Sequence, residues 1–476
     1  MGVTPFPPVA IEFALTFAGV YKSRRGARLE LQLYRVKNMT NIAQTRTWIS
    51  RKHCSGTWSR LAPTTALMLC LTMSPFANAA KLKALHSFDE TVDGSQPIAG
   101  LIPGIDGNFY GTASEGGANS NGTVFQITPG GTLSVIYSFC KLTSCTDGAQ
   151  PSGALIFGSD GNLYGTTAAG GADNEGTVFE LTLGGTLTVL YSFCSKADCA
   201  DGSQPIAALV QGTDGNFYGT TSAGGSSPGY GTVFQLIPNG TMSTLNTLHS
   251  FRLTDGDYPG APLIQATDGN FYGTTQAGGA GTVKKPKGQG TVFQITPGGM
   301  FTNLYTFCPG KAKCPFGAQP ISGLVQGSDG NFYGTTATGG SYKNCAYGCG
   351  TIFEVTSGGA LTSLAKFNAD NGDYPAGGLI QAADGTLYGT TAQGGAASFG
   401  VCEYGCGTVF EVTSEGKLKT LATFDITDGD FPVATLLLAD ETLYGTTQSG
   451  GVEEGKPGTV FKFAPVASSP ALQSAP

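Results

Sequence analysis

One eight-residue line recurs seven times along the chain and constrains its fold more than any other feature. Its clearest copy, Asp214 to Thr221, reads Asp-Gly-Asn-Phe-Tyr-Gly-Thr-Thr. The Asp of the line stands at positions 106, 160, 214, 268, 329, 384 and 440, so the copies follow one another at intervals of 54 to 61 residues. A nearly fixed period of this length is typical of a repeat architecture in which every copy forms the same supersecondary unit.

Each repeat contains four short runs that are rich in β-branched and aromatic residues and are separated by Gly, Asp and Asn. In the second copy these runs are Gly153–Phe157, Asn162–Thr167, Gly176–Leu181 and Thr186–Phe193. This pattern predicts β-strands, and the Asp-Gly pair between the first two runs predicts a hairpin turn because Gly accepts a positive φ. No helical periodicity occurs after residue 80. We therefore expect an all-β chain with four antiparallel strands per repeat, named A to D from the inside outward.

The two ends of the repeat region indicate a closed ring. The first run, Lys81–Phe88, matches a D strand, whereas the last run, Gly458–Phe463, matches a C strand that no D strand follows. Pairing the first run with the last one completes the seventh sheet and leaves no open edge at the join. This offset predicts a seven-bladed β-propeller. An open β-solenoid, the alternative, has no reason for the offset.

A proline precedes the first run of every repeat, and we interpret it as the first residue of strand A, where its missing N–H is tolerated. These prolines are Pro97, Pro151, Pro205, Pro259, Pro320, Pro375 and Pro432.

The first 80 residues have the features of an N-terminal extension with a secretory signal. A basic segment from Arg46 to Arg60 precedes the short apolar run Ala66–Met73, and Ala77-Asn78-Ala79 offers a small-x-small cleavage site near Ala79/Ala80. Met39 is a candidate start. The apolar run is short for a membrane-anchoring helix, the alternative interpretation. We expect domains at 1–80 (extension and signal), 81–465 (propeller) and 466–476 (disordered tail).

Charge separates the extension from the repeats. Residues 1–80 carry 10 Lys/Arg and 2 Asp/Glu, a net of +8, and the whole chain has 26 and 33, so residues 81–476 carry 16 and 31, a net of −15. An acidic repeat region disfavours nucleic acid as a partner. We expect a secreted, extracellular or periplasmic monomer with no membrane span in the mature chain.

Ten of the twelve cysteines follow the signal, and they form five close pairs in the variable loops. The pairs are Cys140/Cys145, Cys194/Cys199, Cys308/Cys314, Cys345/Cys349 and Cys402/Cys406. An even number of cysteines in an exported chain predicts disulfides. The alternative for the third and fourth pairs, which belong to one blade, is a Cys₄ zinc site.

The D–A and B–C loops vary in length and chemistry, and in a propeller both emerge on the same face. Loops on a rigid scaffold often carry binding residues, so we predict a ligand site on this face; simple tolerance of insertions is the alternative. The candidate residues are Asp257, Tyr258, Asp373, Tyr374, Asp430, Tyr230 and Tyr342. The acidic loops could bind Ca²⁺, but turn formation is the better explanation of their Asp residues; no other cofactor is expected.

The repeats offer few parts for catalysis. They contain two histidines, His86 and His249, which replace a D-strand Tyr and which we interpret as packing residues, and one arginine, Arg252. A Ser-His-Asp arrangement needs a His on the loop face, and we expect none there. A two-carboxylate mechanism needs no His. We therefore expect a non-catalytic binding or display module for a protein or glycan, and keep a carbohydrate-active hydrolase or lyase using loop carboxylates as the alternative.

The Asp-Gly-Asn-Phe-Tyr-Gly-Thr line and the Gly-Thr-Val-Phe line resemble the repeats of the bacterial family called GloVer, or choice-of-anchor, proteins. The resemblance covers roughly residues 81–465. It implies secretion and surface display, and it brings no established activity. Members of the family end in varied surface anchors, whereas the segment Ser468–Pro476 contains no apolar anchor.

Overall fold

The computed structural model describes residues 81–240, 243–279, 288–310, 313–340, 345–395, 402, 404–452 and 457–465, and the backbone alone of 281–282 and 285–286. The predictions made for residues 1–80, for the tail 466–476 and for Tyr342 lie outside these residues. The described part belongs to one compact unit, Ser74–Pro476.

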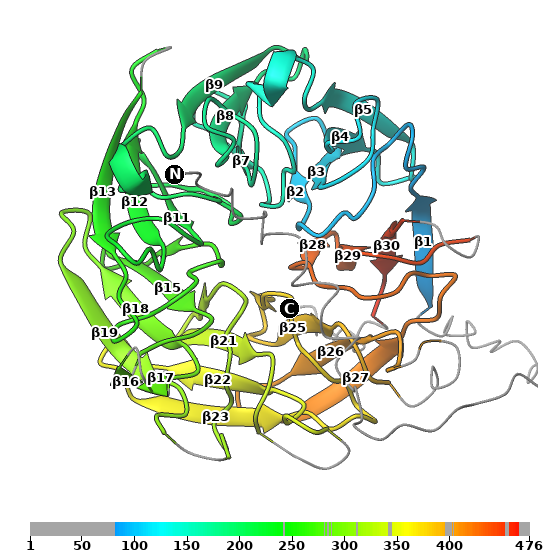
Figure 1. Cartoon of the computed structure of the whole chain (residues 1–476). Coiled ribbons are helices and arrows are strands. Elements are labelled where there is room, and N and C mark those ends of the chain that lie inside the picture. The colour runs from blue at the N-terminus through cyan, green and yellow to red at the C-terminus, as the bar shows by residue number, and fades with distance from the viewer. Residues whose placement is uncertain are drawn as a thin grey trace, which may run out of the picture. The chain divides into compact units, whose positions relative to one another are not determined.

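Seven four-stranded antiparallel sheets form a ring, as predicted (Figure 1). In the order A to D, blade 1 holds β2 (Ile102–Pro103), β3 (Phe109–Ala113), β4 (Thr123–Ile127) and β5 (Leu133–Ser138); blade 2 holds β6 (Ile156–Phe157), β7 (Leu163–Thr167), β8 (Thr177–Leu181) and β9 (Leu187–Ser192); blade 3 holds β10 (Val210–Gln211), β11 (Phe217–Thr221), β12 (Thr232–Ile237) and β13 (Thr244–Ser250); blade 4 holds β14 (Ile264–Gln265), β15 (Phe271–Thr275), β18 (Thr291–Ile295) and β19 (Phe301–Thr306). Blade 5 holds β20 (Val325–Gln326), β21 (Phe332–Thr336), β22 (Thr351–Val355) and β23 (Leu361–Lys366); blade 6 holds β24 (Ile380–Gln381), β25 (Leu387–Thr391), β26 (Thr408–Val412) and β27 (Leu418–Thr423); blade 7 holds β28 (Leu437–Ala439), β29 (Thr442–Thr447), β30 (Thr459–Phe463) and β1 (Leu82–Ser87).

Blade 7 closes the ring in the predicted way. Strand β1 pairs with β30 in antiparallel register, from Leu82 opposite Phe463 to Ser87 opposite Thr459. Beyond the strand, the Phe88 N–H donates to the Gly458 carbonyl at 3.1 Å. The first described strand therefore supplies the outer edge of the last sheet, so the sheet order is complete only when both ends of the ring meet.

The prolines are not the first residues of strand A, which corrects the prediction. Strand A is two residues long in six blades and begins five residues after the proline, as at Pro205 and Val210. The prolines are buried, and each packs on the glycine that precedes strand C of the preceding blade. A Cβ at Gly231, for example, would lie 2.6 Å from Pro259 Cδ. The proline is thus part of a contact between blades, which the pattern of a single repeat does not reveal.

The hydrophobic core lies between the blades. All five residues of strand B are buried in blades 1 to 5, and strand C buries every residue of its first five except the fourth. A Phe after each D strand packs edge-on against the strand C Phe of the next blade, with ring centroids 4.9–5.2 Å apart. The seven pairs are Phe88 with Phe125, Phe139 with Phe179, Phe193 with Phe234, Phe251 with Phe293, Phe307 with Phe353, Phe367 with Phe410, and Phe424 with Phe461. Such a pair contributes about 0.5–1.5 kcal/mol beyond the area it buries.

The A–B and C–D turns define one face of the ring, here called the turn face. In blade 3 the Asp214 carboxylate accepts hydrogen bonds from the Asn216 backbone N–H (3.1 Å), the Asn216 side chain (2.7 Å) and the Tyr218 hydroxyl (2.8 Å). Gly215 takes a φ of +82°, as predicted for the Asp-Gly pair. The repeated line therefore encodes a turn and its own hydrogen-bond network.

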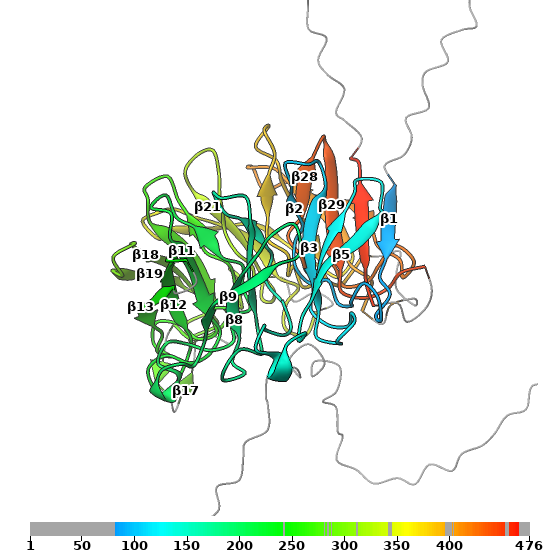
Figure 2. The ribbon, with the colours of Figure 1, turned by 90° about the horizontal axis from the view of Figure 1, so that it is seen from above.

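The opposite, loop face carries the D–A and B–C loops. Within the described residues, helical turns are confined to two short 3₁₀ segments, η2 (Thr143–Cys145) and η3 (Ala197–Cys199), and the B–C loop of blade 4 forms the ribbon β16 (Gly281–Thr282) and β17 (Lys285–Pro286). Figure 2 shows the ring on edge, with β1, β3 and β29 running between its faces and β17 at the loop face. In the part of the chain that the structure describes, no helix is long and apolar enough to span a membrane.

Candidate functional site

Each D–A loop joins its own blade to the preceding one, a junction here called a seam and named by its two blades. At seam 3/4, Asp257 forms an antiparallel bridge with Ala277. The next residue, Tyr258, donates its N–H to the Tyr230 carbonyl of blade 3 at 3.2 Å, and its own carbonyl accepts the Gln276 N–H at 3.1 Å. The backbone of Tyr258 therefore connects two blades.

The residue at the Tyr258 position has a left-handed backbone in every blade. The seven residues are Gln96, Gln150, Gln204, Tyr258, Gln319, Tyr374 and Phe431, with φ between 53° and 61°. This conformation costs a residue other than glycine about 1–2 kcal/mol. Within the described residues, the N–H of this residue donates to a backbone carbonyl of the preceding blade at five of the seven seams, and the five donors are Gln96, Gln150, Gln204, Tyr258 and Gln319. Because the strain recurs at all seven seams, it belongs to the fold and does not by itself mark a functional site.

The side chains at this position divide the seams into two groups. Four seams carry Gln after a small residue, as in Ser203-Gln204, whereas three carry an aromatic residue after Asp. These three acidic–aromatic pairs are Asp257-Tyr258 at seam 3/4, Asp373-Tyr374 at seam 5/6 and Asp430-Phe431 at seam 6/7. The structure thus gives five of the predicted site residues equivalent places on the loop face, but on separate seams.

The three carboxylates are half-buried, and burial raises the pKa of each of them. For Asp373 burial raises the pKa to about 6, against the opposing effect of a hydrogen bond from the Tyr374 backbone. The ion pairs among the described residues are His86 with Asp93, His249 with Asp255 and Lys419 with Glu411, so none includes these three carboxylates. Each one is desolvated without a cationic partner among the residues that the structure describes, which disfavours its charged form.

The aromatic members of the pairs differ in exposure. Tyr258 is 37% exposed, whereas Tyr374 is more deeply placed, and burial together with the charge of Asp373 raises the pKa of its phenol. Tyr230, another predicted site residue, packs at the edge of the core between blades 3 and 4. The Tyr230–Tyr258 backbone contact brings these two predicted residues together, while Tyr342 is outside the described residues.

All five predicted disulfides are present, and all lie in loops of the loop face. Cys140–Cys145, Cys194–Cys199 and Cys308–Cys314 close D–A loops, and Cys345–Cys349 and Cys402–Cys406 close B–C loops. The alternative of a Cys₄ zinc site is therefore wrong for this structure, because its four cysteines pair within their own loops.

Sequence reasoning missed what lies beside two of these disulfides. The Asp373 carboxylate belongs to blade 6, yet it lies against Cys345 and Cys349 of blade 5, and Asp430 of blade 7 lies in the same way against the disulfide of blade 6. The signal was present in the repeated motif Cys-X-Tyr-Gly-Cys of those two loops. Its relation to the Asp of the following repeat requires the seam geometry.

The two histidines lie beside loop aspartates. His86 Nε2 lies 2.8 Å from Asp93 Oδ2, and His249 Nε2 lies 3.4 Å from Asp255 Oδ2. At the equivalent place in blade 1 the Tyr137 hydroxyl donates to Asp147 Oδ2 at 2.8 Å. His86 therefore makes the hydrogen bond that a Tyr makes in blade 1. His249 Nε2 is buried without a hydrogen bond, and its ring stacks on Phe301 with centroids 3.9 Å apart, which is the packing role that the sequence suggested.

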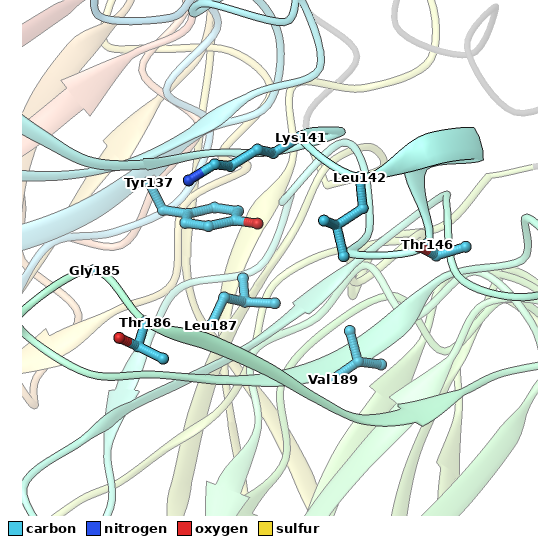
Figure 3. Close-up of a pocket in the computed structure, with 8 residues that line it drawn as sticks. All are labelled: Tyr137, Lys141, Leu142, Thr146, Gly185, Thr186, Leu187 and Val189. Carbon is cyan, nitrogen blue, oxygen red and sulfur yellow. The ribbon is translucent and has the colours of Figure 1, made fainter.

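A groove of about 580 Å³ lies away from the acidic–aromatic pairs, between the outer strands of blades 1 and 2 (Figure 3). Tyr137, Leu142 and Leu187 supply its apolar lining, and Lys141 Nζ lies 5.9 Å from the centre of the Tyr137 ring. The groove and the half-buried carboxylates are therefore two separate candidate ligand sites. We give more weight to the carboxylates, because the groove is open and has few polar groups that could fix a ligand.

A family model described as the Gloeobacter/Verrucomicrobia repeat matches residues 72–201 and 195–402 of this chain. The two matches together cover more than half of it. The chain belongs to this repeat family. In this member of the Gloeobacter/Verrucomicrobia repeat family, the seven copies of the sequence line correspond to seven propeller blades.

Several solved structures are similar to this family member at low identity. The extracellular domain of a hybrid two-component system from B. thetaiotaomicron is 11% identical with a TM-score of 0.48, and the match covers 80% of this chain and 41% of that one. A gluconolactonase from Xanthomonas campestris is 13% identical with a TM-score of 0.38, covering 82% and 90%. A protein of unknown function from Dyadobacter fermentans is 11% identical with a TM-score of 0.44, covering 81% and 98%. No curated protein matches the sequence. Likeness at this level carries no functional assignment.

Proposed function

We propose that this protein is an exported, non-catalytic propeller that binds a ligand on its loop face through the acidic–aromatic pairs. One observation carries the proposal. Three of seven otherwise matching seams place a half-buried carboxylate, without a cationic partner among the described residues, directly before an aromatic residue.

Burial of these carboxylates outweighs the hydrogen bonds that they accept. Burial raises the pKa of Asp257, Asp373 and Asp430, which means that each disfavours the folded state at neutral pH. Ser203 and Ala149 occupy the same bridge position at other seams, so the fold does not require Asp there. A ligand that supplies hydrogen-bond donors or positive charge would compensate the desolvated carboxylate. Tyr258, Tyr374 and Phe431 would add apolar contact surface.

Export is part of the same proposal. Five disulfides suit an oxidising compartment, outside the cytosol. The sequence adds a signal-like segment, which is typical of an exported chain. Its acidic repeat region disfavours nucleic acid as a partner. We therefore place the ring outside the cytoplasm, in the periplasm or the medium.

A binding role fits the arrangement of groups better than catalysis. Glycoside hydrolysis uses two carboxyl groups about 5–9.5 Å apart. Seams 3/4 and 6/7 hold a second half-buried carboxylate in the same D–A loop, Asp255 and Asp428, whereas at seam 5/6 the other loop aspartate, Asp370, is exposed. The two histidines lie beside Asp93 and Asp255, in the place where other blades use a Tyr. A hydrolase or lyase stays the alternative to be tested, and calcium binding by the acidic loops stays a prediction.

The ring itself offers a matched replacement for the test. Changing Asp257-Tyr258, Asp373-Tyr374 and Asp430-Phe431 to Ser-Gln copies the sequence of Ser203-Gln204 and suits the same left-handed backbone. We expect the ring with all three changes to fold and to lose binding at least about tenfold towards ligands found on a glycan array or by capture from the native secretome.

Two controls make the result decisive. The substitution Gln319→Tyr, at a seam without the preceding Asp, should leave binding unchanged. Wild-type affinity in the triply changed ring would refute the proposed site. Turnover in a hydrolysis screen that disappears in Asp257→Asn or Asp373→Asn would favour the enzymatic alternative.

A further inference from the structure

The B–C loops of blades 5 and 6 end in the same five-residue motif, Cys-X-Tyr-Gly-Cys. The motif spans 345–349 in blade 5 and 402–406 in blade 6. In the first loop the Tyr347 carbonyl accepts the Gly339 N–H at 2.9 Å, and the second loop repeats this bond at 2.8 Å. The two loops thus have matching sequences, matching disulfides and a matching backbone contact.

A carboxylate from the following blade completes each loop. One carboxylate oxygen of Asp373 and the sulfur atoms of Cys345 and Cys349 all lie within 4.8 Å of one another, and Asp430 forms the same trio with Cys402 and Cys406. The four cysteines are buried and both aspartates are half-buried. Within the part of the chain that the structure describes, only these two disulfides meet a carboxylate in so compact a trio, so the arrangement is specific to seams 5/6 and 6/7.

We propose that each trio is a binding site for a thiophilic divalent metal ion of the zinc class when its disulfide is reduced. Cys-x₃-Cys lies within the spacing that zinc sites use, and zinc accepts two thiolates and one carboxylate at about 2.0–2.3 Å. Ligands of these lengths fit a trio whose donor atoms already lie within 4.8 Å. Three protein ligands leave the fourth position for water or a further ligand.

The conversion needs one named co-reactant, a dithiol reductant. The dithiol gives two electrons and two protons to the protein disulfide, whose S–S bond breaks to form two thiols, and the dithiol itself becomes a disulfide. The divalent ion then displaces the two thiol protons to solvent, and two metal–sulfur bonds form. The carboxylate completes the protein ligands.

The two states would connect different parts of the ring. The disulfide joins residues of one loop, Cys345 to Cys349, and so stays within blade 5. A metal ion that also binds Asp373 joins blade 5 to blade 6, across seam 5/6. Reduction with metal uptake therefore exchanges a link within a loop for a link between blades. This inference does not depend on the ligand site proposed above, although two aspartates are shared.

The test uses the full mature chain, prepared in a reducing cytoplasm and kept anaerobic so that its cysteines are thiols. Co²⁺ is the probe, because thiolate ligands give it an intense charge-transfer absorption, and Zn²⁺ is the competitor. We expect two Co²⁺ ions per chain, both displaced by Zn²⁺. The double variant Cys345→Ser/Cys349→Ser should retain one ion, and Asp373→Asn should weaken one site at least about tenfold.

Matched controls separate this site from general thiol binding. Asp257→Asn, at an equivalent seam without cysteines, and Cys194→Ser/Cys199→Ser, a disulfide without the carboxylate, should each leave two ions bound. Absence of the charge-transfer absorption would overturn the proposal. So would unchanged affinity in both Asp373→Asn and Asp430→Asn, or loss of an ion in the Cys194→Ser/Cys199→Ser variant. The cobalt spectrum is read without the unidentified ligand, so either proposal can fail alone.

Discussion

The two faces of the ring use the same residue, aspartate, in opposite ways. On the turn face, burial raises the pKa of Asp214, but hydrogen bonds from Tyr218 and Asn216 outweigh burial and hold it below its usual value. The turn aspartates of four other blades behave in the same way: Asp106, Asp160, Asp268 and Asp329. On the loop face burial raises the pKa values of Asp257, Asp373 and Asp430. Asp425 of the same face is an exception, because burial raises its pKa but hydrogen bonds from Thr427 and Asp428 outweigh burial and lower it.

The comparison shows which aspartates the fold needs. A carboxylate whose donors come from its own turn stabilises the folded chain at neutral pH, and it recurs because every blade needs the turn. A carboxylate whose pKa is raised by burial opposes folding at neutral pH, and such a carboxylate directly precedes an aromatic residue at three seams. Four experiments with substituted variants test this contrast.

The largest difference is expected between a glycine of each face. Gly231 of the loop face has a φ of +95°, and a Cβ there would collide with the Thr221 carbonyl and lie 2.6 Å from Pro259. Gly215 of the turn face has a φ of +82° but no atom within 4 Å of such a Cβ. We expect Gly231→Ala to lower the free energy of unfolding by about 3 kcal/mol or more and Gly215→Ala by about 1 kcal/mol. Equal losses in urea denaturation would show that backbone strain alone, and not the seam contact, decides both.

The second effect concerns the loop disulfides. The loop between Cys194 and Cys199 is short, so chain entropy predicts a loss of about 2 kcal/mol in Cys194→Ser/Cys199→Ser. The ring should stay folded, because its core lies between the blades and not in the loops. Urea denaturation followed by circular dichroism measures the loss, with the wild-type ring as reference. A variant that is unfolded at 25 °C would contradict the view that these bonds only fix loops.

The third effect compares Asp214→Asn with Asp257→Asn. The first removes the charge that three donors of the turn stabilise, and we expect a loss of about 1 kcal/mol at pH 7. The second removes a desolvated charge that solvent partly screens, so we expect a gain of a few tenths of a kcal/mol. The measurement is the free energy of unfolding at neutral pH. Changes of the same sign would remove the distinction between the two faces.

The smallest effect is the pH dependence of the same two variants. The turn aspartate has a lowered folded pKa, so its stabilisation is present above the unfolded value of about 3.9 and disappears as the pH falls through the folded pKa. The loop aspartate, Asp257, has a pKa that is raised in the folded state. Its carboxyl group therefore favours the folded state most below the unfolded pKa of about 3.9, and this stabilisation is lost as the pH rises through the folded pKa.

Thermal unfolding between about pH 3 and pH 8 checks both statements. Asp214→Asn should reduce the change of melting temperature with pH below about pH 3.9, and Asp257→Asn should reduce it above that pH. The converse assignment, or profiles that both match the wild type, would contradict the pKa directions.

The sequence predicts the ring well because its decisive information is local and repeated. The Asp-Gly turn, the strand residues and the displaced D strand each follow from short-range patterns, and the structure confirms the pairing of Leu82 with Phe463. The disulfides also follow from close spacing. A feature that lies within a single repeat can be predicted from the sequence of that repeat.

The seams could not be predicted in the same way, because each combines residues from two repeats. The burial of Pro259 against Gly231 of the preceding blade explains why the proline is not in strand A. The left-handed backbone of Gln204 or Tyr258 gives no compositional signal, since Gln and Tyr are not residues that favour it. The approach of Asp373 to Cys345 depends on the folded path of a B–C loop whose length changes from blade to blade.

The closure of blade 7 also decides how the ring can be tethered. Leu82 and Phe463 are partners in neighbouring strands, and both lie where a D strand begins and a C strand ends, which is the turn face. Segments attached to either end of the ring therefore depart from the same spot. A ring held to a cell surface through either segment would direct its loop face, with the acidic–aromatic pairs and the two cysteine–aspartate trios, away from that surface.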